Sequence, residues 1–257
     1  MYGILSDEFD LILFAGQSNM AGRGCVEEAA VCPHGVGWEY RAVTDPDHIH
    51  PLMEAFGQHE NRPGLIDDGE KKTGSLVSAL ATEYHRLTGR CVVGVSASRG
   101  GTSSQEWHDG LVQDAAMRLE QASSWLKAQG LTPQNTLVLW CQGETDGDHA
   151  VPAEEYRCNF EVIWQRLKSA GASCCGLIQI GHFNRTMYPE DLRDEQYAVV
   201  REEQLRIAGE VPGVFLAASF EPWEHQMKDA FHYCQKAYDN VGVEAARNVA
   251  EYLKNKR

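Results

Sequence analysis

Short apolar runs alternate with amphipathic stretches along most of the chain, and this alternation strongly limits its fold. Five runs are rich in β-branched or large apolar residues, which is typical of buried strands: residues 10–15, 91–97, 136–140, 174–180 and 213–218. Helical spacing of apolar residues covers residues 74–87, 109–129, 152–170, 194–208 and 235–254. Alternating strands and helices predict an α/β fold, a three-layer α/β/α sandwich around a five-stranded parallel sheet.

Length and charge narrow the classes of function. The chain has 257 residues, enough to bury a core without metals or disulfides, and one domain over residues 1–257 is the simplest organisation. It carries 37 Asp and Glu against 23 Lys and Arg, a net charge of -14. Proteins that bind phosphate backbones need a basic surface stripe. We therefore expect no nucleic-acid partner and no membrane partner, and the oligomeric state is left open.

The start of the chain predicts a cytoplasmic protein. The first residues contain neither the basic stretch nor the apolar stretch of a signal peptide, and no later window has the length and hydrophobicity of a membrane span. The eight cysteines show no C-x-x-C spacing, which suits reduced thiols. A processed secreted form is the alternative.

One long segment lacks any regular spacing of apolar residues. Residues 23–72 contain four prolines and many glycines and histidines, and we expect an irregular excursion there. Within it, Trp38, Tyr40 and the histidine-rich residues 48–59 are candidates for a lid over a functional site.

Unusual polar sequences follow the ends of the predicted strands. Residues 16–22 (GQSNMAG) follow the first strand, residues 98–103 (SRGGTS) the second and residues 141–146 (CQGETD) the third, while residues 229–232 (DAFH) precede the last helix. In open parallel sheets, ligands bind beyond the carboxyl ends of the strands. The four motifs are therefore expected to meet at one edge of the sheet and to form the functional site.

Ser18 lies on a glycine-flanked turn from a buried strand into a helix. Such a turn can project a nucleophilic hydroxyl out of the sheet and leave backbone N–H groups free for an oxyanion. A serine at this place also suits a helix N-cap. The G-x-S-x-G motif of α/β-hydrolases is absent, because Met20 occupies the position of its last glycine.

Asp229 precedes His232 by three residues. This spacing can place a carboxylate on one imidazole nitrogen while the other nitrogen faces Ser18, as in a catalytic triad. The same spacing also suits an isolated surface or capping pair.

Together, the four motifs resemble those of SGNH (GDSL-type) hydrolases, in the branch of carbohydrate esterase family 6 and sialate O-acetylesterase-like domains. Residues 16–22 resemble its nucleophile block, residues 100–102 its glycine block, residues 140–144 its Gln-Gly-Glu block and residues 229–232 its Asp-x-x-His block. The resemblance implies a flavodoxin-like fold. It also implies a cofactor-free serine esterase that removes O-acetyl groups from carbohydrate, such as acetylxylan or an acetylated sialic acid, through an acyl-enzyme.

The resemblance further implies roles for single residues. Ser18 is then the nucleophile, and His232 is the general base and later the general acid. Asp229 orients His232 and stabilises the imidazolium. Glu144 is the alternative third member of this triad, a carboxylate that supports His232, or a structural group bonded to N–H donors of the loop.

An oxyanion hole is implied as well. Its donors are the N–H of Ser18, the N–H of Gly101 or Gly100, and the side-chain amide of Gln142, which stands where other SGNH enzymes have asparagine.

Further residues are candidates for contacts with substrate. Gln17 and Asn19 flank Ser18, Arg99 and Trp107 flank the glycine block, and His182 follows the fourth predicted strand. Residues of these types more often have structural roles, as a surface arginine (Arg99), a core tryptophan (Trp107) and a bonded loop histidine (His182).

No metal site is expected. Glu144, Asp146, Asp148 and Glu155 have the spacing of a calcium loop, but His149 stands where that loop needs glycine. No H-x-x-x-H pair lies on a predicted helix, which disfavours zinc.

Two other functions remain open at this level. One keeps the fold and mechanism but acts on a thioester or another ester that is not a carbohydrate. The other is a sugar-binding module without catalysis.

Overall fold

A computed structural model describes residues 8–256 and has a seven-stranded sheet at its centre. The sheet order is β3-β2-β4-β1-β5-β6-β7. The strands are β1 (Phe9–Gly16), β2 (Gly37–Arg41), β3 (Asp45–Pro51), β4 (Cys91–Ser98), β5 (Thr136–Cys141), β6 (Cys174–Gln179) and β7 (Val214–Ser219). Only the β2–β3 pair of this sheet is antiparallel. The predicted α/β fold is therefore confirmed, and the five predicted strands occur within one or two residues of their expected bounds.

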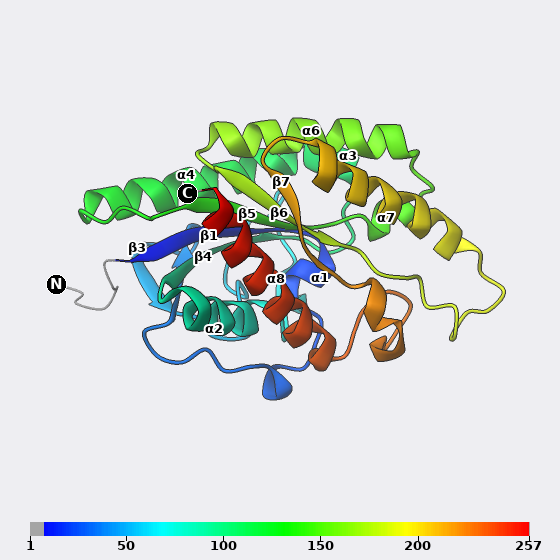
Figure 1. Cartoon of the computed structure of the whole chain (residues 1–257), viewed down its shortest axis with the longest axis horizontal. Helices are drawn as coiled ribbons and strands as arrows, with labels where there is room; N and C mark the ends of the chain where they lie inside the picture. Colours follow the sequence, from blue (N-terminus) through cyan, green and yellow to red (C-terminus); the bar gives the residue numbers. More distant parts are fainter. Residues whose placement is uncertain (1–7, 257) are drawn as a thin grey trace.

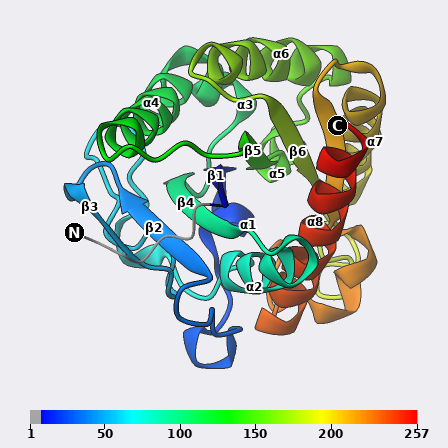
Figure 2. The same cartoon turned by 60° about the vertical axis from the view of Figure 1, so that its left-hand side comes forward.

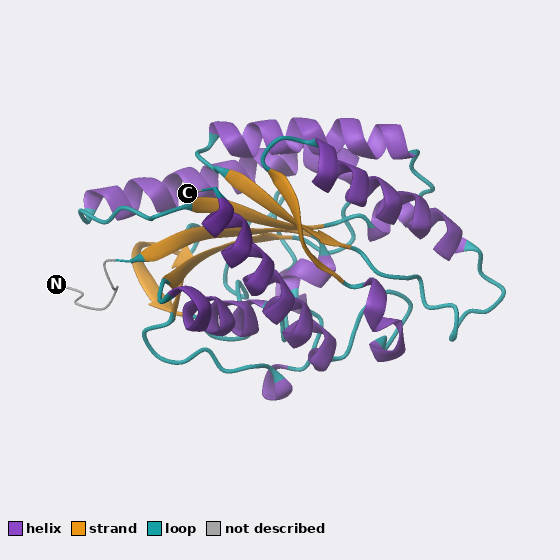
Figure 3. Cartoon of the chain, viewed as in Figure 1, coloured by secondary structure: helices purple, strands orange, loops and turns teal. Residues whose placement is uncertain are grey.

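Helices cover both faces of this sheet (Figures 1 and 3). One layer holds α2 (Val77–Thr88) and α8 (Gln235–Asn255), and the other holds α4 (Val112–Ala128), α6 (Ala153–Ser169) and α7 (Arg193–Glu210). Shorter elements are α1 (Ser18–Ala21), η1 (Val26–Glu28), η2 (Gly69–Lys71), α3 (Ser104–Glu106), η3 (Trp107–Leu111), α5 (Glu144–Asp148) and η4 (Glu221–Gln226). The three-layer arrangement is thus confirmed.

Neighbouring residues of β1 belong to two different cores. Leu11 and Leu13 pack in the core beneath α4, α6 and α7, whereas Ile12 and Phe14 pack in the core beneath α2 and α8. Successive strand residues point to opposite faces of a sheet. Because helices cover both faces, both sets of residues must be apolar, which explains the continuous apolar runs of the sequence.

The prediction of five strands missed β2 and β3, which lie inside the segment predicted to be irregular. Residues 37–40 of β2 pair in parallel with β4, and β3 pairs with β2 at the edge of the sheet (Figure 2). Pro46 and Pro51 are the second and the last residue of β3, which also carries charged residues. Its sequence therefore lacks the run of apolar residues that marks the other strands. Its structure depends on the neighbouring strand that it meets in the fold.

The prediction that Trp38 and Tyr40 belong to a lid over the functional site is wrong. Trp38 and Tyr40 lie on β2 and are each 2% exposed, as part of the core. His48 and His50 lie on the edge strand β3, where both contact Asp45. Pairing with β4 therefore buries β2 in the sheet, whereas β3 forms its largely exposed edge.

The strand register brings three polar motifs to one level. Gly16, the last residue of β1, pairs with Ser98 of β4 on one side and with Cys141 of β5 on the other. α1 begins directly beyond this edge (Figure 1). The expected meeting of the motifs at the carboxyl ends of the strands is confirmed.

None of the eight cysteines, all within residues 8–256, forms a disulfide. Among residues 8–256, no helix combines the length and the apolar character that crossing a membrane requires.

Candidate active site

Ser18, His232 and Asp229 form one chain of hydrogen bonds. The Nε2 atom of His232 lies 2.9 Å from Oγ of Ser18, and its Nδ1 atom lies 2.9 Å from Oδ2 of Asp229. Oδ1 of Asp229 accepts hydrogen bonds from the backbone N–H groups of Phe231 and His232 at 3.0 and 2.7 Å. This arrangement lets the imidazole take a proton from the Ser18 hydroxyl while the carboxylate faces the opposite nitrogen.

The turn before Ser18 requires glycine at position 16. Gly16 has φ +139°, and a Cβ atom there would lie 1.9 Å from the carbonyl oxygen of Cys141. The next residue, Gln17, donates its N–H to that same carbonyl at 2.8 Å, and α1 begins at Ser18. Ser18 is thus the first residue of the helix and not its N-cap, which is Gln17. Its Oγ atom is turned to His232.

Asp229 remains charged in this arrangement. Burial alone would raise its pKa, but the hydrogen bonds from His232 and from the N–H of Phe231 outweigh that effect and hold the pKa well below its usual range. A carboxylate that stays ionised can stabilise the imidazolium that forms when His232 accepts a proton.

Glu144 lies in the same pocket but is not bonded to His232. Its Oε1 atom accepts a hydrogen bond from Nδ2 of Asn19 at 2.5 Å, and its buried Oε2 atom has no hydrogen-bond partner among the described residues. Burial raises the pKa of Glu144 to about 7, although the bond from Asn19 opposes the rise. The structure therefore places Asp229, and not Glu144, against Nδ1 of His232.

The two candidate glycines have different environments. The N–H of Gly100 donates to Oδ1 of Asp68 at 2.8 Å, so it is already occupied. Gly101 lines the pocket with φ +69°, and its N–H, like that of Ser18, has no acceptor within residues 8–256. Ser18 and Gly101 therefore offer free backbone donors.

The amide of Gln142 is not available to a substrate. Gln142 is completely buried, and its Nε2 atom donates to the carbonyl oxygen of Thr102 and to the carboxylate of Asp146. The expectation that this amide contributes to an oxyanion hole is therefore not supported. This buried side chain belongs to a hydrogen-bond network that links the loop after β5 to the glycine motif.

Gln17 has the amide that faces the pocket. Its Oε1 atom accepts hydrogen bonds from the backbone N–H groups of Gly143 and Thr145, at 3.1 and 3.4 Å, which identifies that atom as the oxygen. Its Nε2 atom has no acceptor in the described part of the chain, and the residue lines the pocket with Ser18. The expected contact of Gln17 with substrate is compatible with this position.

Four other candidates do not line the pocket. Asn19 is fully buried and bonds to Glu144, to the carbonyl of Phe231 and to the hydroxyl of Tyr238. The remaining three also have structural partners: Arg99 donates to the carbonyl of Leu65, His182 bonds Asp194, and the buried Trp107 donates to Thr102.

The pocket around Ser18 has a volume of about 230 Å³, and most of the residues that line it are polar or glycine. It is lined by Gln17, Ser18, Arg23, Asp68, Lys71, Gly100, Gly101, Glu144, Thr145, Asp148, Phe231 and His232. Phe231 is the one apolar side chain among them.

Sequence reasoning missed six of these residues. Thr145, Asp148 and Phe231 lie within or beside the motifs, so a wider reading of each motif would have included them. Three others, Arg23, Asp68 and Lys71, belong to the segment without regular spacing, where no pattern in the sequence marks them.

The residues with calcium-loop spacing do not converge on an ion site. Both oxygens of the buried Asp146 accept hydrogen bonds from Ser104, and Asp148 contacts Arg193. In the described structure, no group of three acidic, histidine or cysteine side chains is arranged for a metal ion.

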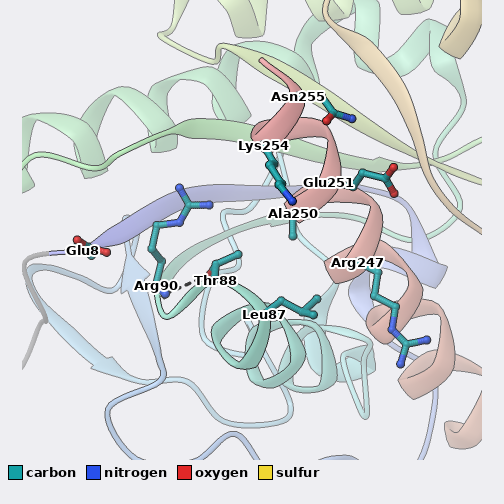
Figure 4. Close-up of a pocket in the computed structure, with 9 residues that line it drawn as sticks. All are labelled: Glu8, Leu87, Thr88, Arg90, Arg247, Ala250, Glu251, Lys254 and Asn255. Carbon is teal, nitrogen blue, oxygen red and sulfur yellow. Dashed lines mark hydrogen bonds between the residues drawn. The ribbon is translucent and has the colours of Figure 1, made fainter. Parts of the chain in front are cut away.

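A second pocket lies at the opposite end of β1. It is bounded by the ends of α2 and α8 and includes Arg90, Arg247 and Lys254 (Figure 4). Glu8 lies on it, directly before β1, whereas Ser18 follows the other end of that strand. This pocket is therefore separate from the candidate active site.

Comparisons with known proteins agree with this geometry. The model of a family described as carbohydrate esterase, sialic acid-specific acetylesterase, matches residues 8–251. A probable carbohydrate esterase of Arabidopsis thaliana, At4g34215, is 27% identical over 201 residues, which cover 72% of this chain and 74% of that protein.

Solved structures show the same fold. The structure of the Arabidopsis protein aligns with a TM-score of 0.71 and 22% identity, over 96% of this chain and 99% of that one. The structure of NanS aligns with a TM-score of 0.62 and 16% identity, over 99% of this chain and 100% of that one. A G-D-S-L family lipolytic protein from Veillonella parvula aligns with a TM-score of 0.50 and 12% identity, over 94% and 97% of the two chains.

The buried Glu144 predicts a pH-dependent stability. Its pKa rises from 4.5 to about 7 on folding, so the folded protein binds more protons than the unfolded chain between these values, and stability falls as pH rises through them. Glu144→Gln removes this loss. We expect the free energy of unfolding of Glu144→Gln, measured in urea and compared with that of wild type, to increase by on the order of 2 kcal/mol from about pH 5 to about pH 8.

Glu155→Gln, at an exposed position of α6, is the matched control and should show no such trend. A difference in stability between Glu144→Gln and wild type that does not change with pH would contradict the raised pKa of Glu144.

Proposed function

Because the chain belongs to the carbohydrate esterase family described as sialic acid-specific acetylesterase, and is thus a carboxylic ester hydrolase, we propose that it removes O-acetyl groups from a sugar through an acyl-enzyme on Ser18. One observation carries this proposal: the Ser18–His232–Asp229 chain opens into a small pocket of about 230 Å³ that is walled mainly by polar residues and glycines. The polar groups of this wall suit a sugar hydroxyl as leaving group, and the small volume disfavours a long acyl chain.

Acylation begins with attack of Ser18 Oγ on the acetyl carbonyl carbon. The hydroxyl proton passes to Nε2 of His232, and the carbonyl oxygen becomes an oxyanion. When the tetrahedral intermediate collapses, the bond between the carbonyl carbon and the sugar oxygen breaks. His232 returns the proton to that oxygen, so the sugar leaves as an alcohol and the acetyl group stays on Ser18.

Deacylation repeats the sequence with water. His232 takes a proton from the water as its oxygen attacks the acetyl carbonyl. The bond between the carbonyl carbon and Ser18 Oγ then breaks and His232 returns the proton to Oγ, so acetic acid leaves and ionises to acetate in solvent. Asp229 accepts the hydrogen bond from Nδ1 of His232 throughout, which favours the tautomer that presents Nε2 to Ser18.

Three donors bind the oxyanion in this proposal. They are the N–H groups of Ser18 and Gly101 and the Nε2 atom of Gln17, in place of the Gln142 amide. The backbone bonds to Oε1 of Gln17 hold its amide in one orientation, so no reorganisation is needed when charge develops on the substrate.

An O-acetylated sialic acid is the first substrate to test. The family description names sialic acid, and Lys71 places on the pocket wall a cation that has no ion-pair partner among residues 8–256. Acetylated xylan fragments, which are neutral, form the second group of substrates in this proposal.

Replacing the nucleophile tests the proposed function. We expect Ser18→Ala to lower acetate release from an aryl acetate and from O-acetylated sugars by at least about a thousandfold, because no other group forms the acyl-enzyme. Acetate would be measured enzymatically, and circular dichroism would verify the fold. Ser169→Ala, at the exposed end of α6, should keep wild-type activity, and a chelator should not change it.

Acetate release by Ser18→Ala at the wild-type rate would exclude the acyl-enzyme on this residue. Loss of activity on addition of a chelator would instead indicate a metal-dependent hydrolysis.

The oxyanion donors can be separated by two variants. Gln17→Glu keeps an anchored oxygen but replaces the donor Nε2 by an acceptor, and we expect kcat/KM to fall about 100-fold or more. Gln142→Met removes a buried hydrogen-bonding group, so we expect it to lower the unfolding temperature. Its kcat/KM should fall less than that of Gln17→Glu. A folded Gln142→Met variant with the larger loss of kcat/KM would return the oxyanion role to Gln142.

Acyl-chain length tests the substrate class. With aryl esters of acetate, butyrate and octanoate, we expect kcat/KM to fall at least about tenfold from acetate to butyrate and further to octanoate, because a pocket of about 230 Å³ has little room for a longer acyl chain. Equal or rising values along the series would favour a lipid or another long acyl ester.

A further inference from the structure

Asp68 reaches the candidate active site from outside the four sequence motifs. It ends segment 52–68, which connects β3 to η2 and belongs to the part of the chain without regular spacing. Its side chain is only 2% exposed, yet the residue lines the pocket with Ser18. A carboxylate buried beside a nucleophile needs partners that satisfy its charge.

Both oxygens of Asp68 have such partners. Oδ1 accepts the N–H of Gly100 at 2.8 Å, and Oδ2 accepts Nη2 of Arg23 at 2.7 Å. The Nη1 atom of Arg23 donates in turn to the carbonyl oxygens of Gly22 and Lys71, at 2.9 and 3.0 Å. One ion pair therefore joins the nucleophile motif, the glycine motif and the end of segment 52–68.

Gly100 is held between this ion pair and the nucleophile. A Cβ atom on Gly100 would lie 2.5 Å from Nη2 of Arg23, 3.1 Å from Oδ1 of Asp68 and 3.3 Å from Cβ of Ser18. The backbone at this point therefore fills the whole space between the pair and Ser18. The following residue, Gly101, carries the free N–H and has φ +69°.

We propose that Asp68 is a positioning residue that fixes the Gly100–Gly101 backbone against Ser18, so that the N–H of Gly101 is oriented toward the oxyanion. The proposal rests on the proposed function. Asp68 touches neither the substrate nor the reacting atoms; it acts through the N–H of Gly100.

Arg23 has an electrostatic part in this arrangement. A lone carboxylate near the oxyanion would repel the charge that develops there. The guanidinium of Arg23 neutralises Asp68 at 2.7 Å, so the pair can hold the backbone without adding net charge to the pocket.

The test measures kcat and KM for an aryl acetate, the inhibition constant of methylboronic acid, and the rate at which a fluorophosphonate labels Ser18. The boronate and the phosphonate form tetrahedral adducts, which need oriented oxyanion donors. For Asp68→Ala, we expect kcat and labelling to fall about 10- to 100-fold, boronate affinity to fall in parallel, and KM to change less than about threefold. Asp68→Asn, which keeps an acceptor for Gly100, should recover part of each loss.

Glu60→Gln is the matched control within segment 52–68. Glu60 is likewise a buried carboxylate, and it accepts hydrogen bonds from the N–H groups of Val43 and Thr44 instead of from the glycine motif. We expect this variant to lower the unfolding temperature while kcat and the labelling rate stay within about threefold of wild type.

Several results would overturn the proposal. These are an unchanged kcat in folded Asp68→Ala or Asp68→Asn, a loss confined to KM, or an equal loss of labelling in Glu60→Gln. If wild type is labelled at Ser18 but releases no acetate, the proposed function fails, and the labelling rates of the variants alone decide the role of Asp68. A wild type that is not labelled overturns both proposals.

Discussion

The register of the three central strands is the constraint on which the site depends. Gly16 lies opposite both Ser98 and Cys141, so β1, β4 and β5 end at one level, and the motifs that follow them begin side by side. A slip of one residue would displace a motif by about 3.3 Å and turn its side chains to the other face of the sheet. The contact between Gly16 and the backbone of Cys141 is too close for any side chain at Gly16.

Beneath the pocket, much of the polar sequence is structural. Asp146 binds Ser104 and Gln142, and Asn19 links Glu144 to Tyr238. Buried polar groups need hydrogen-bond partners. These side chains find most of theirs in one another, while Oε1 of Gln142 and Oε2 of Glu144 have none among the described residues. A side chain inside a functional motif can thus have the task of fixing a loop, which explains why Gln142 and Asn19 do not reach the pocket.

The segment that looked least organised supplies one side of the pocket. Residues 37–41 and 45–51 extend the sheet, and the chain that follows returns to the catalytic edge with Asp68. Its position depends on buried anchors such as Glu60, which binds the turn between β2 and β3. The order of this loop comes from specific contacts instead of from a regular pattern of residues.

The sequence by itself determined five of the seven strands, β1 and β4 to β7, the long helices and the candidate triad of Ser18, His232 and Asp229. Apolar runs between covering helices predict buried strands wherever they occur, and the motifs mark the groups that are suited to ester chemistry. Only the tertiary structure placed Asp229 instead of Glu144 on His232, left Gly101 free while Gly100 is bonded, and added β2, β3 and Asp68. These outcomes depend on which partner each group meets across the sheet, and residues that meet there lie far apart in the sequence.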